Sequence, residues 1–360
     1  MSQLEKLMRP HLAKIATYSG VDPSEELARK AGIRPEDVIR LNANENPYGP
    51  LDKVSEALTE LPLHLYPDPN QHKLRDALSG YTGQPSERII VGAGGDEIID
   101  LLMRLFVAPG QTVLDCEPTF GMYSFAARLA DAAVASVPRN ATWDIDIEAM
   151  MEAIDNSARI MFFASPNNPT GNLLDELDAR SLLDTGVVVC VDETYYEFSN
   201  NTLSHLLEEY ENLVILRSFS KWAGIAGLRV GYAIASSGLI QHLMDIKQPY
   251  NINIAGEAAV LAALQHKTEL LLRAQTLIEQ RIRLEESIRE MDGVSYYPSW
   301  GNFLLCRFES LTAEDAYVGL AEHGIFVRRF PQVVLESSLR ISAGTPEQTD
   351  RLIDALRNVV

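Results

Sequence analysis

Short apolar segments alternate with longer amphipathic segments between about residue 50 and residue 250 of this 360-residue chain. The apolar segments show little polar alternation, as is typical of strands buried on both faces of a parallel sheet. We interpret six of them as strands, at 88–91, 112–115, 160–164, 187–192, 213–218 and 230–235. Segments with helical spacing follow the first three, at 96–106, 119–129 and 175–183. Since strands that alternate with helices build a mostly parallel sheet with helices on both faces, we predict an α/β fold with a mixed sheet of about seven strands.

The pattern changes after residue 250. A long helical segment at 257–291 carries Glu and Arg on one face and Leu, Ile and Ala on the other. Beyond it, short strands alternate with helices, the strands at 303–308, 325–329 and 339–342 and the helices at 312–323 and 346–358. We therefore predict a large domain over 50–250, a smaller α+β domain over 251–360, and an N-terminal arm over 1–49 that contributes to the small domain.

Composition and charge narrow the classes of partner. Hydrophobic residues make up 46% of the chain and charged residues 22%, which is ordinary for a globular protein and unlike a disordered one. Asp and Glu outnumber Lys and Arg by 50 to 31, so the net charge of −19 repels nucleic acid and anionic lipid surfaces. We therefore expect neither a nucleic acid nor a membrane as partner. An anionic substrate would need a local cluster of arginines to bind against this field.

The sequence also indicates where the protein works. The apolar segments are shorter than the roughly 20 residues that span a bilayer, and residues 1–6 lack the apolar core of a secretory signal. Cys116, Cys190 and Cys306 are odd in number and lie in apolar stretches, which indicates unpaired core cysteines in a reducing compartment. We expect a cytoplasmic protein without disulfide bonds, and the sequence predicts no metal site.

Polar residues gather where the predicted strands end, which is the edge at which open α/β sheets bind ligands. A glycine-rich turn at 92–96 leads into a helix, and its backbone N–H groups suit a phosphate. A tight turn with Asp96 as helix cap is the simpler alternative, and the spacing does not fit the dinucleotide-binding pattern. A second turn, at 165–171, has the prolines and glycine of turn chemistry, which leaves its two asparagines, Asn167 and Asn168, unexplained.

Two further strand ends carry charge. Asp192 is the last residue of a very apolar strand, where an ionised carboxylate needs a cation, either a protonated heteroaromatic nitrogen or a salt-bridge partner. Ser218, Ser220 and Lys221 follow the next strand, and Arg229 comes shortly after. A lysine among apolar and aromatic neighbours loses its charge easily and becomes a nucleophile. The combination of the four strand ends points to one site.

These segments resemble one family, the fold-type I pyridoxal-phosphate (PLP) aminotransferases, over nearly the whole chain. The matching segments are LNANENP at 41–47, NNPTG at 167–171, DETY at 192–195, SFSK at 218–221, GLRVG at 227–231 and LRISAGT at 339–345. Within the family the chain is most similar to members that act on histidinol phosphate. The resemblance implies PLP as cofactor, a homodimer, and amino transfer from L-histidinol phosphate to 2-oxoglutarate in histidine biosynthesis, which gives imidazole acetol phosphate and L-glutamate.

The resemblance also implies roles for single residues. Lys221 would form the Schiff base with PLP and move a proton, Asp192 would pair with the pyridinium nitrogen, and Phe120 would stack on the ring. Tyr195 and Asn168 would hydrogen-bond the phenolic oxygen. The cofactor phosphate would bind a further set: Gly95, Asp96, Ser218, Ser220, Arg229 and, from the neighbouring subunit, Tyr66.

The implied substrate site takes the phosphate of histidinol phosphate where other aminotransferases bind a carboxylate. Around this phosphate the resemblance places four residues: Tyr18, Arg328, Arg340 and, from the neighbouring subunit, Tyr250. It also implies Asn44 as a further substrate contact. A strand-edge charge beside Arg329 is the simpler interpretation of Arg328. Aromatic amino acid aminotransferases and phosphothreonine decarboxylases share nearly all of these residues and remain alternatives. A non-catalytic effector-binding protein of the same fold is disfavoured, since the acidic charge opposes the DNA-binding domain of such regulators.

Overall fold

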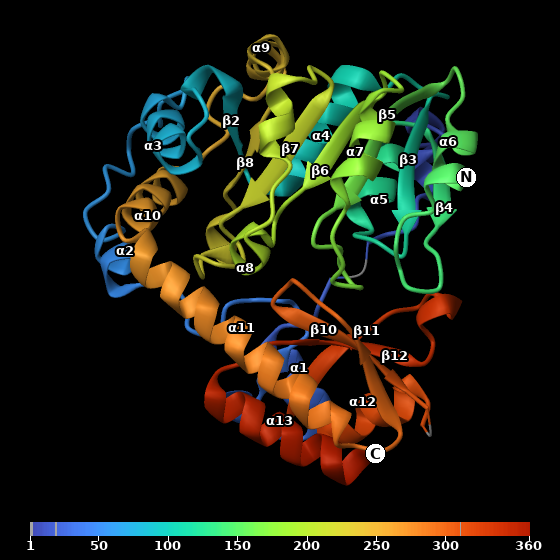
Figure 1. Ribbon diagram of the computed structural model, residues 1–360. Coiled ribbons are helices and arrows are strands. Elements are labelled where there is room, and N and C mark those ends of the chain that lie inside the picture. The colour runs from blue at the N-terminus through green and yellow to red at the C-terminus, as the bar shows by residue number, and fades with distance from the viewer. Residues whose placement is uncertain (1–2, 19, 310) are drawn as a thin grey trace.

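The computed structural model describes residues 3–18, 20–309 and 311–360; residues 1, 2, 19 and 310 of the predicted arm and small domain lie outside that description. The chain forms a large and a small α/β unit, and the long helix α11 (Lys267–Arg289) runs along both (Figure 1). The junction between the two units is therefore where residues from distant parts of the chain can form a site.

A seven-stranded sheet forms the centre of the large unit, in the order β2-β8-β7-β6-β5-β3-β4. Neighbouring strands pair in parallel, except that β8 is antiparallel to both β2 and β7. The strands are β2 (Ile89–Gly92), β3 (Thr112–Glu117), β4 (Ala133–Pro138), β5 (Ala158–Ala164), β6 (Val188–Asp192), β7 (Leu213–Ser218) and β8 (Gly231–Ile234). The prediction of a mixed, mostly parallel sheet is confirmed.

Helices cover both faces of this sheet because its strands are apolar on both sides. Ile160 and Phe162 of β5 belong to an apolar cluster with one set of helices, α4 (Gly95–Phe106), α5 (Met122–Leu129) and α9 (Ser237–Ile246). Met161 and Phe163 belong to the cluster on the opposite face, with α2 (Asp52–Glu56), α3 (His72–Thr82), α6 (Ile147–Ala153), α7 (Glu176–Leu183), α8 (Tyr196–Ser199) and α10 (Ile254–Gln265). This two-sided burial is the physical reason for the continuous apolar runs in the sequence.

The small unit contains a five-stranded sheet, in the order β1-β11-β12-β10-β9. Its strands are β1 (Ile39–Leu41), β9 (Val294–Tyr297), β10 (Phe303–Phe308), β11 (Ile325–Arg329) and β12 (Ser338–Ser342). Two helices, α12 (Ala313–Glu322) and α13 (Pro346–Val359), share a core with one face of the sheet and with the end of α11. β1 pairs in parallel with β11, so residues from the start of the chain complete a sheet made from its end.

The N-terminal arm contacts both units. Its helix α1 (Ser24–Ala31) lies in the small unit (Figure 1). Residues nearer the start reach the large unit, where a ring nitrogen of His11 lies 3.3 Å from the carbonyl of Leu129 at the end of α5. The arm therefore crosses the junction twice, once before α1 and once after β1.

Two details of the sequence-based prediction are wrong. The continuous helix expected over 257–291 is broken at His266 into α10 and α11, and α10 packs on α2 and α3 beside the large sheet. β4 was not expected as a strand: only one of its six residues is buried, so this edge strand lacks the apolar run that marks the others. The division into domains at residue 250 stays an interpretation of the sequence.

The three cysteines are buried and unpaired, as expected. Among the helices of the described residues, none has the length and hydropathy needed to cross a bilayer.

Candidate active site

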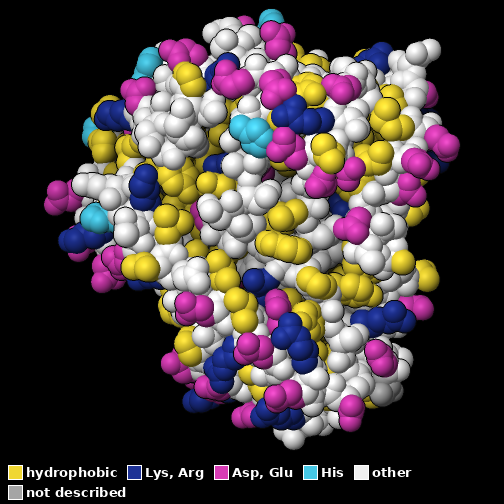
Figure 2. Space-filling view, in the orientation of Figure 1, with side chains coloured by type: hydrophobic (Ala, Val, Ile, Leu, Met, Phe, Trp, Pro, Cys, Tyr) yellow, Lys and Arg dark blue, Asp and Glu magenta, His cyan; other side chains and the backbone are white. Residues whose placement is uncertain are grey.

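The candidate site lies where the carboxyl ends of β5, β6 and β7 meet the small unit. Hydrogen bonds from both units hold the arm segment 42–46 in this junction. Asn46 Nδ2 donates to the carbonyl of Trp222 (2.9 Å) in the large unit, and the backbone N–H of Asn44 donates to Ser342 Oγ (3.0 Å) in the small unit. Hydrophobic side chains gather around this junction in Figure 2, where acidic and basic side chains are interspersed over the rest of the face.

Lys221 follows β7 by three residues and extends toward this segment, where its Nζ donates to the carbonyl of Ala43 (2.9 Å). Burial lowers the pKa of Lys221 to about 8, and the positive charge of Arg340 acts in the same direction. Lys221 is therefore neutral more often at neutral pH than an exposed lysine, and the neutral amine is the nucleophilic form.

Asp192 ends β6 as a buried carboxylate with 6% of its surface exposed. Its Oδ2 accepts a hydrogen bond from the Tyr123 hydroxyl (2.8 Å), and its Oδ1 accepts one from the backbone N–H of Thr194 (3.0 Å). Burial raises the pKa of Asp192. The described part of the chain offers this carboxylate no Lys, Arg or His at ion-pair distance, so a ligand with a protonated ring nitrogen fits the place.

The predicted phosphate site has the close backbone approach that its glycines imply. Gly94, with φ +80°, ends the turn before α4, and a Cβ atom on Gly231 would lie 2.7 Å from the backbone nitrogen of Gly95. Gly231 is the register partner of Ser218, whose Oγ donates to Ser220 Oγ (2.9 Å). The start of α4 and the two hydroxyls therefore lie side by side, as an anion site requires.

Arg229 closes the same corner. Its Nη2 donates to Asp96 Oδ2 (2.9 Å), with both side chains about half exposed, and would lie 2.7 Å from a Cβ atom on Gly94. The donor set of backbone N–H groups, hydroxyls and one guanidinium is the chemistry that binds a phosphate ester. These donors fit the phosphate of PLP, and Asp192 fits the ring nitrogen of PLP.

Tyr195 and Asn168 both belong to the large unit, and each hydrogen-bonds to a residue outside it. The Tyr195 hydroxyl accepts a hydrogen bond from Asn44 Nδ2 (2.9 Å), and burial raises the pKa of this tyrosine. Asn168 Oδ1 accepts from Arg340 Nη1 (2.5 Å). Asn44 Oδ1 accepts from Ser342 Oγ (2.8 Å), so both polar atoms of the Asn44 side chain are bound within the protein and its substrate contact stays a prediction.

Arg328 and Arg340 are register partners on the antiparallel strands β11 and β12, so their side chains start on the same face of the sheet. Both guanidinium groups lie over the ring of Phe330, at 5.9 and 5.7 Å from its centroid. Arg340 is 5% exposed and binds the Asn42 carbonyl, while its buried Nε has no partner among the described residues. Burial lowers the pKa of Arg340 to about 10, and the charge of Arg328 adds to this effect.

Two aromatic residues from distant parts of the chain complete this side. Tyr18 of the arm and Phe120, which precedes α5, pack edge to face with ring centroids 6.4 Å apart. Tyr18 is close enough to Arg340 and Tyr195 for its charge to affect the pKa of each. Tyr18 therefore lies in the neighbourhood of Arg340 and Tyr195, and its substrate contact stays a prediction.

Tyr66 and Tyr250 lie elsewhere. Their rings stack on each other at 4.4 Å, in the connection before α3 and after α9, and 80% and 48% of their surfaces are exposed. Within one chain they make no recorded contact with Lys221 or Arg340, as far as the described residues go. Their predicted roles therefore depend on a second subunit.

Sequence reasoning missed two supporting contacts. Asn167 donates to the Pro118 carbonyl (2.9 Å) and locks the turn that presents Asn168. Arg217 and Glu193 form a buried ion pair (2.8 Å) that ties the ends of β6 and β7 together. The signal for the ion pair was present in the sequence, since each residue adjoins a predicted site residue at the end of an apolar strand.

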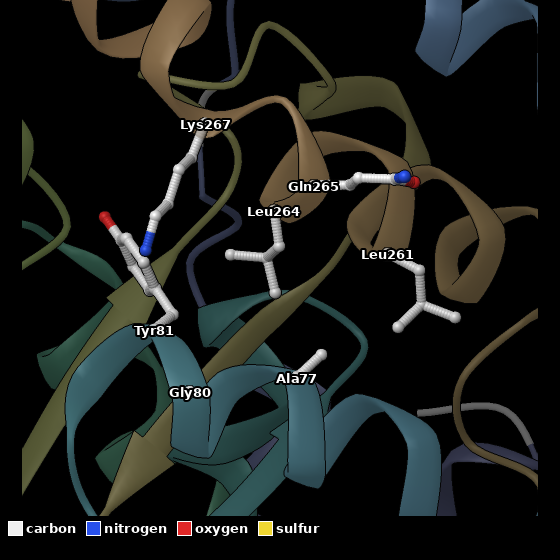
Figure 3. A pocket seen from close by; sticks show the side chains of 7 residues that line it. All are labelled: Ala77, Gly80, Tyr81, Leu261, Leu264, Gln265 and Lys267. Carbon is white, nitrogen blue, oxygen red and sulfur yellow. The ribbon is translucent and has the colours of Figure 1, made fainter.

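An open pocket of about 290 Å³ lies outside this site, between α3 and the junction of α10 and α11 (Figure 3). The Lys267 amine lies 5.2 Å from the centroid of the Tyr81 ring there, and Leu264 points into the gap. Lys221 and Asp192 are not among the lining residues, so this pocket is separate from the candidate site.

The geometry and the fold together define an enzyme class. The model of the family "Aminotransferase class I and II" matches residues 36–356, which is nearly the whole chain. The chain therefore belongs to this family.

Individual proteins similar to this chain carry a more specific name than the family. The chain is 44% identical to a histidinol-phosphate aminotransferase from Roseiflexus castenholzii, over 98% of each chain. It is 42% identical to histidinol-phosphate aminotransferase 1, chloroplastic, from Arabidopsis thaliana, over 98% of this chain and 86% of that one. A solved structure of a histidinol-phosphate aminotransferase from Sinorhizobium meliloti, in complex with pyridoxal-5'-phosphate, superposes with a TM-score of 0.86 at 26% identity and covers 98% of this chain and 97% of the other. The predicted family and fold class are confirmed.

Proposed function

We propose that this chain is a PLP-dependent aminotransferase that moves the amino group of L-histidinol phosphate to 2-oxoglutarate, giving imidazole acetol phosphate and L-glutamate in histidine biosynthesis. Its similarity to histidinol-phosphate aminotransferases supports this reaction over nearly the whole chain. The single structural observation that carries the proposal is the pairing of Arg328 with Arg340.

Arg328 and Arg340 are register partners, so two guanidinium groups start from the same face of the small sheet. Two guanidinium groups match the charge of a phosphate monoester, which approaches −2 at neutral pH, better than that of a single carboxylate. The Nε atom of the buried Arg340 has no hydrogen-bond partner among the described residues, so an acceptor oxygen of a ligand would satisfy it. These features favour a phosphorylated substrate over an aromatic amino acid.

PLP fits the remaining groups of the site. Asp192 would hold the ring nitrogen, Ser218, Ser220 and Arg229 with the start of α4 would hold the phosphate, and Lys221 would bond to the aldehyde carbon. When bound, PLP supplies an electron-withdrawing ring that stabilises negative charge on the substrate's Cα.

The chain's own groups then do three things. The Lys221 amine, freed when the substrate's amino group displaces it, would take the proton from the substrate's Cα and deliver it to the carbon that carried the aldehyde, which its lowered pKa suits. Asp192, buried and hydrogen-bonded, keeps a positive charge at the ring nitrogen. Arg328 and Arg340 orient the substrate through its phosphate, so that the Cα proton faces Lys221.

Half-reaction kinetics test the proposed function directly. PLP-loaded protein is mixed separately with L-histidinol phosphate, L-phenylalanine and O-phospho-L-threonine, and the loss of the cofactor's visible absorbance is followed. We expect kcat/KM for histidinol phosphate to be at least about 100-fold higher, because two guanidinium groups bind a phosphate better than they bind the single carboxylate of phenylalanine. Faster conversion by phenylalanine would make the chain an aromatic aminotransferase. Release of CO₂ from phosphothreonine would make it a decarboxylase.

The pKa of Lys221 predicts how PLP capture by the apoprotein depends on pH. Only the neutral amine attacks an aldehyde, so the rate should rise with pH up to about 8 and then level off. An exposed lysine, with a pKa near 10.4, would give a rate that keeps rising to about pH 10. Stopped-flow absorbance between pH 6 and 10 measures this profile, and a rise that continues past pH 9 contradicts the assignment.

A homodimer with shared active sites belongs to the same proposal. Tyr66 and Tyr250 are exposed and stack on each other, and Leu63 and Leu65, close to Tyr66 in the chain, are exposed as well, which supports burial against a second copy. In that arrangement each subunit would supply Tyr66 and Tyr250 to its partner's site. The predicted cytoplasmic location also stays a proposal, supported by the three buried cysteines without disulfide bonds.

Mixing two inactive variants tests the shared site. We expect Lys221→Ala and Tyr66→Ala each to be strongly impaired, and a 1:1 mixture, unfolded and refolded together, to regain roughly a quarter of the wild-type activity. Half of the random dimers would then hold one intact site, because both substitutions fall in the other. Each variant refolded alone is the control. A mixture no more active than the two controls would show that Tyr66 acts within its own subunit.

A further inference from the structure

Tyr123 is a buried residue of α5 to which neither the resemblance nor the proposed mechanism gives a role. Its hydroxyl donates to Asp192 Oδ2 at 2.8 Å, and none of its surface is exposed. Asp192 is its recorded partner, so the hydroxyl satisfies its hydrogen-bonding requirement on the carboxylate that would hold the cofactor's ring nitrogen.

The ring of Tyr123 also contacts the residue expected to stack on the cofactor. It packs edge to face against Phe120, with centroids 5.5 Å apart and an interplanar angle of 83°. On its other side it stacks on Phe162 of β5 at 4.9 Å and 13°. Phe162 is fully buried in the core, and its packing holds the Tyr123 ring in place. The held ring packs against Phe120, and its hydroxyl binds Asp192.

The groups around Asp192 show why this hydroxyl matters. Asp96 at the start of α4 disfavours the ionised form of Asp192, and Cys190 and Tyr195 on the same stretch of chain supply no positive charge. Thr194, two residues along the chain, lowers the pKa of Asp192 through its side chain and its backbone N–H, and Tyr123 is the side chain that donates to the carboxylate from a different element. A hydrogen bond from a donor stabilises the ionised form of a carboxylate, so loss of this bond favours the protonated form of Asp192.

We propose that Tyr123 is a positioning residue that acts through Asp192: its hydroxyl keeps the carboxylate ionised and aimed at the cofactor's ring nitrogen, while its ring supports Phe120. The inference rests on the proposed PLP site. It predicts an effect on cofactor binding and on the proton at the ring nitrogen, both of which are measurable without turnover.

The test compares Tyr123→Phe with Tyr81→Phe in the full-length protein. Tyr81 is the matched control, because its hydroxyl also donates to a carboxylate, Glu197 (3.0 Å), that the proposed cofactor site does not use. The dissociation constant of PLP from the apoprotein is measured between pH 5 and 9. Protonated Asp192 cannot pair with a protonated ring nitrogen, so affinity falls as the pH drops through the pKa of Asp192. Loss of the donor raises that pKa, so Tyr123→Phe should begin to lose affinity about one pH unit higher and bind roughly tenfold more weakly at a pH where Asp192 is protonated in both proteins.

Two further measurements separate this role from a general structural one. In an Asp192→Asn background, Tyr123→Phe should change PLP affinity by less than twofold, because no carboxylate remains for the hydroxyl to keep ionised. ¹⁵N NMR of ring-labelled PLP should move toward the neutral-nitrogen position in Tyr123→Phe and stay in place in Tyr81→Phe. A pH profile identical to wild type, or an equal loss in the Asp192→Asn background, overturns the inference. Failure of the wild-type protein to bind PLP at all would instead overturn the proposed function.

Discussion

Replacing Lys221 by alanine is expected to abolish the visible absorbance of bound PLP and to lower turnover by on the order of 10⁴-fold. The amine is the proposed bonding partner of the cofactor and the group that moves the Cα proton, so one substitution removes two functions. The Lys221 amine lies against the Ala43 carbonyl, and the described residues place no second amine at that position. Absorbance spectra of the PLP-loaded variant and single-turnover kinetics with histidinol phosphate measure both losses.

Lys267→Ala is the control for this experiment. Lys267 lies in the separate pocket beside Tyr81 and should keep both the absorbance and the turnover. Retained absorbance in Lys221→Ala would mean that another lysine bonds to the cofactor. Loss of both signals in the two variants alike would point to a folding defect, which far-ultraviolet circular dichroism detects.

Arg328→Ala is expected to lower kcat/KM for histidinol phosphate by at least about 30-fold, and to affect phenylalanine far less. Removing one partner of a charged, hydrogen-bonded contact costs about 2 to 5 kcal/mol of binding free energy. Each 1.4 kcal/mol corresponds to about a tenfold change in kcat/KM. Phenylalanine has no phosphate, so the remaining Arg340 can serve its carboxylate. Half-reaction kinetics with the two substrates give the ratio directly.

Arg329→Ala is the matched control, because Arg329 is the next residue of β11 and forms an ion pair with Glu314. Side chains alternate along a strand, so this arginine starts on the opposite face from Arg328. It should leave the preference for histidinol phosphate unchanged. Equal losses for both substrates in Arg328→Ala would remove the assignment of a phosphate pocket.

The tertiary structure changed the interpretation of some residues more than others. The strand ends with Asp192, Lys221 and the glycine turn were recognisable from the sequence, because a polar residue after an apolar run is a local signal. Tyr123 carries no such signal: it looks like one more aromatic residue on an amphipathic helix, and only packing shows that its hydroxyl meets Asp192. The break at His266 was equally invisible, because the apolar pattern continues through it.

The sequence by itself determined the alternation of strands and helices, the order of the motifs, and the residue types available for a phosphate, a ring nitrogen and an aldehyde. These features depend on neighbours within a few residues, where side-chain period and backbone preference act. Only the tertiary structure decided that Arg328 and Arg340 stand opposite each other, and that Ala43 lies against Lys221. The first contact depends on strand register, and the second joins residues 178 positions apart where the two units meet. Such contacts follow from the burial of whole faces rather than from any local pattern.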